Sequence, residues 1–466
     1  MPNALRSFLY GIAPICTDRA QFAKEYLTFP LRGTTLCTKI IEGGKGMPNI
    51  DFLTSLALIL LSSLVLGSIF RACKLPPLLG MLLVGIILGP HLLNLIAGPI
   101  LEVSSSLREI ALIVILTRAG LSLNLKDLKI VGRPAVLLCM VPALTEILGY
   151  MLFATLFVGT SLLESAIIGT VIAAVSPAVV VPRMIALQEQ RYGTLHSVPQ
   201  MVNAGSSMDD IFVIVAFTAL VGMAKGGNFD FGIFWEVPVS IILGIAVGAG
   251  VGYLLVLFFR HVHTRDTVKI IVMISFAFLF VTLENAISEY VPFSAMLAVV
   301  TVGVTYNALD PLRSARLSKK YEKIWVLAEI ILFVLVGAAV DLEYVAKSGG
   351  IMVAVIFLAL LFRMGGVFLS LIRTPLSIKE RTFCAIAYIP KATVQAALGA
   401  IPLAMGLGCG PVVLTAAVLS IIITAPLGAF AIDLTSHRLL PLEPLPPTDP
   451  PTESTEDAPP AEDAAQ

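Results

Sequence analysis

The chain has 466 residues, of which 57% are hydrophobic and 13% charged, and its mean hydropathy is +0.93. Soluble domains are about one quarter charged, so this composition argues against a water-soluble fold. The 31 basic and 31 acidic residues leave no surplus for a nucleic-acid partner, the five histidines lack metal-ligand spacing, and the six cysteines contain no CxxC pair that would suggest a disulfide framework or a zinc site.

The N-terminus lacks a basic stretch followed by an apolar core and a cleavage site, so we expect the first spanning helix to direct membrane insertion. Runs of about 20 apolar residues, the length that crosses the hydrocarbon core, follow one another from residue 51 to residue 437. They predict an all-α polytopic membrane protein with about thirteen transmembrane helices. The predicted ranges are 50–70, 77–97, 107–125, 134–158, 164–189, 198–224, 231–259, 267–289, 293–308, 323–345, 349–373, 381–407 and 410–436.

The loops alternate in basic content, and Lys and Arg accumulate on the cytoplasmic side of membrane proteins. Even-numbered loops hold only Lys225 and Lys347. This pattern places the odd-numbered loops and the C-terminus in the cytoplasm, and the predicted location is a bacterial inner (cell) membrane. The basic residues of the odd-numbered loops are Arg71, Lys74, Lys126, Lys129, Arg133, Arg183, Arg191, Arg260, Arg265, Arg313, Arg316, Lys319, Lys320, Arg373, Lys379 and Arg381.

The two ends of the chain need separate interpretations. Residues 1–49 carry six basic residues yet would lie outside the cell. Either this segment is long enough to escape the charge rule, or a part such as 8–15 re-enters or crosses the membrane. Residues 439–466 are rich in proline, alanine and acidic residues and contain no lysine or arginine, which predicts a disordered cytoplasmic tail.

Two prolines in the fifth span and one in the twelfth predict helix breaks. Pro177 and Pro182 lie in AVSPAVVVPRM, and we expect the interruption near Ser176; Pro390 lies beside Lys391 in AYIPKATVQAALGAIP. Interrupted backbone at membrane depth is tolerated only inside protein or beside a water-filled cavity. Two broken helices in matching positions of two halves indicate a midplane site between inverted repeats.

Asp209 and Asp210 lie in the middle of the sixth span, in NAGSSMDDIFVIVAF. A charge at this depth costs about 3 kcal/mol or more, so the pair calls for an explanation. Helix neighbours point about 100° apart, so one carboxylate is expected to bind an ion while the other meets a partner. Mutual repulsion and desolvation favour proton uptake by one of them, as a proton-exchanging site requires. The alternative is a helix cap or a structural ion pair.

Three further ionisable side chains lie deep in predicted spans. Arg363 cannot deprotonate and can serve only as a fixed counter-charge. Two aspartates and one arginine leave one negative charge, which one sodium ion or one proton would neutralise; this predicts electroneutral one-for-one exchange. Lys391 and Glu146 are the best available partners for one another, and we favour a structural salt bridge between crossing helices over a direct role in transport.

The chain resembles the cation/proton antiporters, and more closely the NHA-type sodium/proton antiporters of the aspartate-aspartate group. The resemblance covers about residues 104–440 and rests on five segments in the same order. The segments are SSSLREIALIVILTRAGLSLNL, GTVIAAVSPAVVVPRMIALQ, AGSSMDDI, AYIPKATVQAALGAI and LSIIITAPLGAF.

This resemblance implies a homodimer in which each protomer has a dimerisation scaffold and a six-helix core that moves across the membrane. Asp210 would be the principal ion and proton ligand, supported by Asp209, and Arg363 falls where many electrogenic relatives have a lysine. The implied division is scaffold helices at 50–125 and 267–345, core helices at 134–224 and 349–438, and a linker helix at 231–259, with 1–49 and the tail 439–466 outside both.

We therefore predict a secondary-active sodium (or lithium)/proton antiporter, without a cofactor and without enzymatic activity. Ion ligands would come from Asp210, Asp209, Ser176 and freed backbone carbonyls. Potassium/proton exchange is the first alternative, because hard monovalent cations share oxygen ligands, and a cation channel is the second. An intramembrane aspartyl protease is disfavoured because its two aspartates need separate helices.

Overall fold

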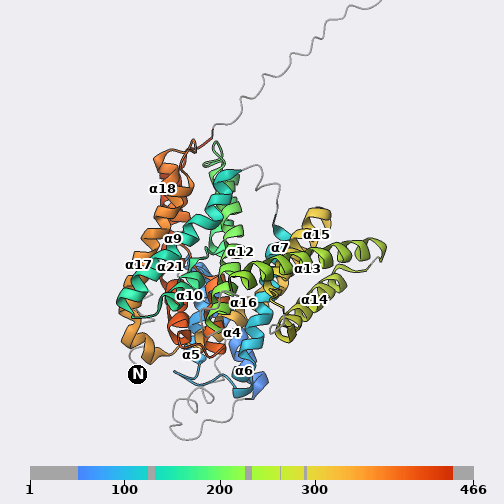
Figure 1. The fold of residues 1–466 in the computed structure, drawn as a ribbon. Helices are drawn as coiled ribbons and strands as arrows, with labels where there is room; N and C mark the ends of the chain where they lie inside the picture. The colour runs from blue at the N-terminus through green and yellow to red at the C-terminus, as the bar shows by residue number, and fades with distance from the viewer. Residues whose placement is uncertain (1–50, 124–131, 226–232, 263, 288–290, 444–466) are drawn as a thin grey trace, which may run out of the picture.

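The regular structure is helical throughout the described residues of the computed structural model, which are 51–123, 132–225, 233–262, 264–287 and 291–443 (Figure 1). The N-terminal segment 1–49 and the predicted disordered tail 439–466 lie outside the described residues, except for residues 439–443. Those first tail residues are ordered, since the Gly193 N–H donates to the Pro441 carbonyl at 2.8 Å and the Glu443 N–H to the Arg191 carbonyl at 3.0 Å. The helices are α4 (Phe52–Ala72), α5 (Pro77–Leu88), α6 (Gly98–Glu102), α7 (Ser104–Ser122), α9 (Arg133–Phe157), α10 (Leu162–Ala173), α11 (Pro177–Glu189), α12 (Val198–Lys225), α13 (Ile233–His261), α14 (Asp266–Ile287), α15 (Ala295–Leu309), α16 (Pro311–Ala338), α17 (Leu342–Ser370), α18 (Ile378–Ala387), α19 (Thr393–Gly399), α20 (Ile401–Ala404) and α21 (Gly410–Leu439).

Many of these helices are long and apolar enough to cross a membrane. Within the described residues, eight spans meet that requirement, with α10 and α11 together forming one of them, and three further apolar helices are shorter. Large apolar side chains point outward from α4, α13 and α14, including Leu53 (69% exposed), Ile242 (64%) and Ile271 (64%). Such side chains suit contact with lipid. The protein is therefore a multi-pass integral membrane protein, while the count of thirteen spans stays a prediction.

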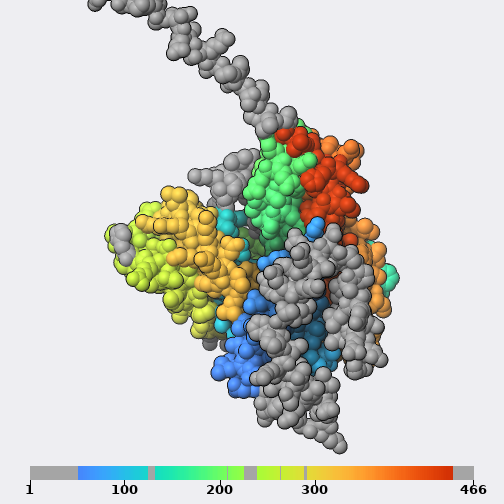
Figure 2. All heavy atoms as spheres, turned by 180° about the vertical axis from the view of Figure 1, so that it is seen from behind, coloured from blue at the N-terminus to red at the C-terminus, as the bar shows by residue number. Residues whose placement is uncertain are grey.

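The helices pack in two groups. α9, α10, α11, α12, α17, α18, α19 and α21 contact one another, and α4, α5, α7, α13, α14, α15 and α16 contact one another. In Figure 2 the yellow-green and yellow helices α13, α14 and α15 lie to one side of the molecule and the red α21 to the other. The predicted division into scaffold, linker and core stays a prediction: α13, the predicted linker, packs with the second group, and α12 and α19 also contact helices of that group.

Glycines allow close helix crossings in both groups. A Cβ on Gly303 of α15 would lie 2.7 Å from the carbonyl carbon of Gly120 in α7. A Cβ on Gly149 of α9 would lie 3.1 Å from the Cα of Ala359 in α17. The second crossing brings α17 close enough to α9 for buried polar side chains on the two helices to meet.

Two half-helices begin with the same N-terminal capping pattern. Ser161 caps α10 and Ser377 caps α18, and in each case a glutamate three residues later, Glu164 or Glu380, bonds back to the cap residue. This reciprocal pattern satisfies two of the backbone N–H groups that a helix start leaves free. Its occurrence at the start of both broken helices is what an internal repeat would produce.

Glu380 also connects α18 to the loop that precedes α12. Its Oε1 accepts a hydrogen bond from Nδ1 of His196 at 2.7 Å. Burial raises the pKa of Glu380, but hydrogen bonds from His196 and Ser377 outweigh it, and the net pKa lies below the usual value near 4.5. The contact fixes the start of one broken helix against the helix that carries Asp209 and Asp210.

Replacing Gly303 with alanine should separate α15 from α7 and destabilise the protein by about 1–3 kcal/mol, the usual cost of overpacking. The measurement is the thermal unfolding midpoint of the purified protein in detergent. Gly350→Ala on α17 is the matched control, because a Cβ there meets nothing within 4 Å. Equal midpoints for the two variants would contradict the close crossing.

Replacing Glu380 with glutamine should destabilise the protein at pH 7 by about 1 kcal/mol, because a charge-assisted hydrogen bond is lost. A lowered pKa in the folded state means that the stabilisation is fully present above about pH 4.5 and is lost as the pH falls through the lowered value. The difference in unfolding midpoint between Glu380→Gln and the parent should therefore shrink as the pH falls below about 4.5.

Glu343→Gln serves as the control for that measurement, since Glu343 pairs with Lys347 on an exposed helix face (77% and 72% exposed). Exposed pairs contribute little. A Glu380→Gln effect that is the same at every pH would contradict the role assigned to the Glu380 carboxylate.

Candidate functional site

The first interruption separates α10 from α11. α10 ends at Ala173 and α11 begins at Pro177, and the intervening Ala174 (ψ 141°) and Ser176 (ψ 107°) are extended. The ring of a proline disfavours the helical conformation at the preceding residue, which explains why Ser176 is extended. Pro182, which the sequence predicts as a further break, instead lies inside α11.

The helix continues through Pro182. Because proline has no backbone N–H, the carbonyl of Ala178 loses its helical donor. The Arg183 guanidinium donates to the next carbonyl, that of Val179, at 3.0 Å. Pro177 therefore begins a half-helix, whereas Pro182 lies inside one.

The second interruption separates α18 from α19 and touches the first. α18 ends at Ala387, α19 begins at Thr393, and Pro390 lies between them. The Ser176 backbone N–H donates to the Pro390 carbonyl at 2.9 Å. The two broken helices therefore cross where each is non-helical, and the backbone groups freed at the crossing can face one another.

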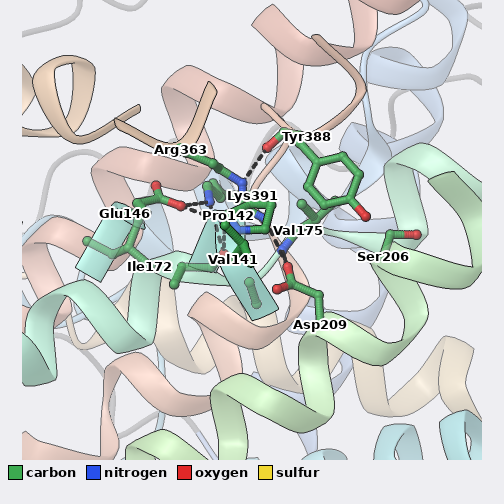
Figure 3. Close-up of polar contacts among 12 residues, drawn as sticks. Val141, Pro142, Glu146, Ile172, Val175, Ser206, Asp209, Arg363, Tyr388 and Lys391 are labelled. Atoms are coloured by element: carbon green, nitrogen blue, oxygen red, sulfur yellow. Dashed lines mark hydrogen bonds and ion pairs between the residues drawn. The ribbon is translucent and has the colours of Figure 1, made fainter. Parts of the chain in front are cut away.

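Arg363 of α17 lies at the centre of the crossing (Figure 3). Its guanidinium is fully buried and donates to Asp209 Oδ2 at 2.9 Å, to Glu146 Oε2 at 2.6 Å and to the Tyr388 carbonyl at 2.9 Å. It also donates to the Ala173 carbonyl at the end of α10. One permanently charged side chain thus links α9, α12 and both interruptions, because a guanidinium carries several N–H donors in one plane.

Lys391 and Glu146 form the buried pair that the sequence suggests. Lys391 Nζ lies 2.6 Å from Glu146 Oε2, and both residues are 1% exposed. The same ammonium group donates to the Ala173 carbonyl at 3.3 Å. The Lys391 backbone N–H donates to the hydroxyl of Thr424 on α21 at 3.0 Å. Glu146 is therefore shared between two cations, Lys391 and Arg363, rather than paired with one.

The two aspartates have different surroundings. Asp209 is fully buried, and its Oδ2 accepts from Arg363 and from the Val175 backbone N–H at 2.8 Å. Asp210 is 7% exposed. Oδ1 of each aspartate has no hydrogen-bond partner among the described residues. One aspartate is thus held by fixed donors through one oxygen, and the other is the less enclosed of the two.

Several uncharged oxygens at the crossing are also buried without a partner. Across the described part of the chain, the Ser176 hydroxyl, the Thr393 hydroxyl and the Gln395 carbonyl oxygen share this property with the aspartates. Thr393 and Gln395 are not among the site residues predicted from the sequence, because that prediction rests on ionisable groups and Ser176. The sequence does contain one indication of Gln395: its amide lies within an apolar run, five residues after Pro390.

The chain matches known proteins over most of its length. The family model described as sodium/hydrogen exchanger, transmembrane, matches residues 57–435. The chain belongs to the sodium/hydrogen exchanger family. Among its curated relatives, the mouse (Mus musculus) sodium/hydrogen exchanger 9B2 is 35% identical over 382 residues, covering 78% of this chain and 69% of the relative. The human (Homo sapiens) sodium/hydrogen exchanger 9B1 is 31% identical over 460 residues, covering 91% and 87%.

A solved structure shows the same fold. The sodium proton antiporter MjNhaP1 from Methanocaldococcus jannaschii, determined at pH 8, aligns with a TM-score of 0.72 at 21% identity and covers 83% of this chain and 99% of its own. At this identity the likeness establishes the shared fold alone. The all-helical membrane fold expected for the exchanger family is confirmed.

Arg363→Gln should destabilise the protein by about 3–5 kcal/mol, because removing one partner of a buried ion pair leaves Glu146 and Asp209 without compensation. Arg183→Gln is the control: it removes an arginine from a partly exposed pair with Asp433 (23% and 50% exposed). That loss should cost about 0–1 kcal/mol. Thermal unfolding midpoints of both variants provide the test, and similar losses would contradict the central position of Arg363.

Proposed function

We propose that this chain is a secondary-active antiporter that exchanges sodium or lithium for protons, with Asp210 as the carboxylate for which the two ions compete. The observation that carries the proposal is the contrast between the adjacent aspartates. Asp209 is engaged by Arg363 and the Val175 backbone through Oδ2. Asp210 Oδ1 is buried with no hydrogen-bond partner among the residues that the structure describes. The names of the relatives agree, since they are called sodium/hydrogen exchangers.

The partnerless oxygens near the crossing suit a small hard cation. Sodium and lithium prefer oxygen ligands, and buried oxygens without donors are costly unless something compensates them. Asp210, with Oδ1 of Asp209 and the Ser176 hydroxyl, would supply such ligands to a partly dehydrated ion. A proton on Asp210 would remove the charge that attracts the ion. Competition for one carboxylate couples the two fluxes without direct contact between them.

The charges near the crossing favour one-for-one exchange. With every group charged, three acids (Glu146, Asp209 and Asp210) face two bases (Arg363 and Lys391), which leaves one negative charge. One sodium ion or one proton neutralises it, so the loaded site moves through the membrane without net charge. The empty site retains its charge and crosses poorly, because uncompensated charge in low dielectric is costly.

We infer an elevator-type movement, in which the core helices at 134–224 and 349–438 move against the scaffold helices at 50–125 and 267–345. The linker helix at 231–259 would join them. Support comes from the two groups of contacting helices and from the location of every charged site residue in the core group. A homodimer formed through the scaffold, and a cytoplasmic C-terminus in a bacterial inner membrane, belong to the same proposal.

Asp210→Asn should abolish sodium-driven proton movement, because the amide can neither release a proton nor balance the ion's charge. The protein should remain folded, since Asp210 makes no ion pair among the described residues. The test is dequenching of a pH-sensitive dye in proteoliposomes, with sodium, lithium and potassium supplied in turn. Asp433→Asn, at the partly exposed Arg183 pair, is the control and should retain exchange.

Persisting sodium-coupled proton flux in Asp210→Asn would overturn the proposal. A response of the parent protein to potassium alone would replace it with potassium/proton exchange. Ion flux far faster than an exchanger cycle, without proton movement, would replace it with a channel.

A further inference from the structure

We propose that Gln395 is a positioning residue for the ion site: its amide holds the first interruption extended and orients the peptide that donates to Asp209. The inference rests on the proposed function and adds a residue that acts through Asp209 rather than on the ion. Gln395 lies on α19, is fully buried, and carries no charge.

The Gln395 amide bonds two backbone carbonyls of the broken helix. Nε2 donates to Ile172 O at 3.0 Å and to Ala174 O at 2.7 Å. Carbonyl oxygens only accept, so the NH2 group must face them, and both of its donors are used. The other amide atom, Oε1, has no hydrogen-bond partner among the described residues. The structural contribution of the side chain therefore comes from its two N–H donors.

These two carbonyls belong to a set of three that the interruption leaves free. In a continuous helix, Ile172, Ala173 and Ala174 would each accept from the residue four positions later. Pro177 has no N–H to offer Ala173, and the Ser176 N–H donates to the Pro390 carbonyl instead. Side chains from α17, from the second interruption and from α19 donate to these carbonyls instead: Arg363 and Lys391 donate to Ala173, and Gln395 donates to the carbonyls on either side.

The chemistry of glutamine matches this position. Buried carbonyls without donors are costly, so the crossing needs further donors in addition to Arg363 and Lys391. Another lysine or arginine would cancel the single negative charge on which exchange depends. An amide supplies two donors and leaves the charge of the site unchanged.

A single peptide unit connects Gln395 to Asp209. The Ala174 carbonyl and the Val175 N–H belong to the same planar trans peptide and point to opposite sides of the chain. Gln395 donates to that carbonyl, and the N–H donates to Asp209 Oδ2 at 2.8 Å. The bond from Gln395 fixes the plane of this peptide and polarises it, which strengthens the bond to Asp209. Without Gln395 the peptide is free to rotate and Asp209 loses an aligned donor.

The test is Gln395→Met, which keeps the side-chain length and removes both donors. We expect the sodium KM to rise about tenfold, since a lost hydrogen bond to a charged group changes affinity by about that factor. The kcat should change less than threefold, because Asp210 and the charge of the site are intact. Gln190→Met, at the exposed end of α11, is the matched control and should match the parent.

An unchanged sodium KM in Gln395→Met would overturn the inference. A rise in KM accompanied by an equally large fall in kcat and by a lower unfolding midpoint would also overturn it, because that combination indicates a general packing defect. If Gln395→Met does not fold, Gln395→His retains one ring N–H donor and should raise KM by less than tenfold; a parental KM there overturns the inference. A parent that shows no cation-coupled proton flux refutes the proposed function itself, which separates the two failures.

Discussion

The structure depends on one buried guanidinium. Arg363 donates to carboxylates on α9 and α12 and to a backbone carbonyl at each interruption. It therefore offsets acidic charge at membrane depth and holds together four segments that are far apart in the sequence. Because arginine does not lose its proton, this arrangement does not change when the site binds or releases an ion. In the proposed mechanism, the part of the site that exchanges its cargo is Asp210 together with Oδ1 of Asp209 and the Ser176 hydroxyl, which have no hydrogen-bond partner among the described residues.

The interruptions explain why the site lies where it does. A continuous helix satisfies its own carbonyls and offers nothing to an ion or to a side chain. The last residues of α10 and the extended Ala174 direct their carbonyls to Arg363, Lys391 and Gln395, and the Val175 N–H donates to Asp209. Arg363 and Lys391 supply both charge and backbone donors, whereas Gln395 supplies donors without changing the charge of the site.

Much of this site is predictable from the sequence, because ionisable residues are rare within apolar runs. Asp209, Asp210, Arg363, Lys391 and Glu146 stand out for that reason, and prolines 177 and 390 mark the interruptions. Three features were not predictable in this way. Pro182 lies within α11, because a proline can remain inside a helix at the cost of one backbone hydrogen bond. The sharing of Glu146 between Arg363 and Lys391 depends on how α9 and α17 cross. Gln395 is neutral, so it does not stand out within an apolar run as an ionisable residue does.

In the proposed mechanism the buried charges sum to one negative charge, which one cation or one proton neutralises. The most direct measurement is the initial rate of sodium-driven proton movement in proteoliposomes, with and without an imposed membrane potential. A cycle that carried one net charge would respond by about 2.3 kcal/mol per 100 mV. We expect the same rate at zero potential and at potentials of either sign. A rate that rises with one sign of the potential and falls with the other would contradict it.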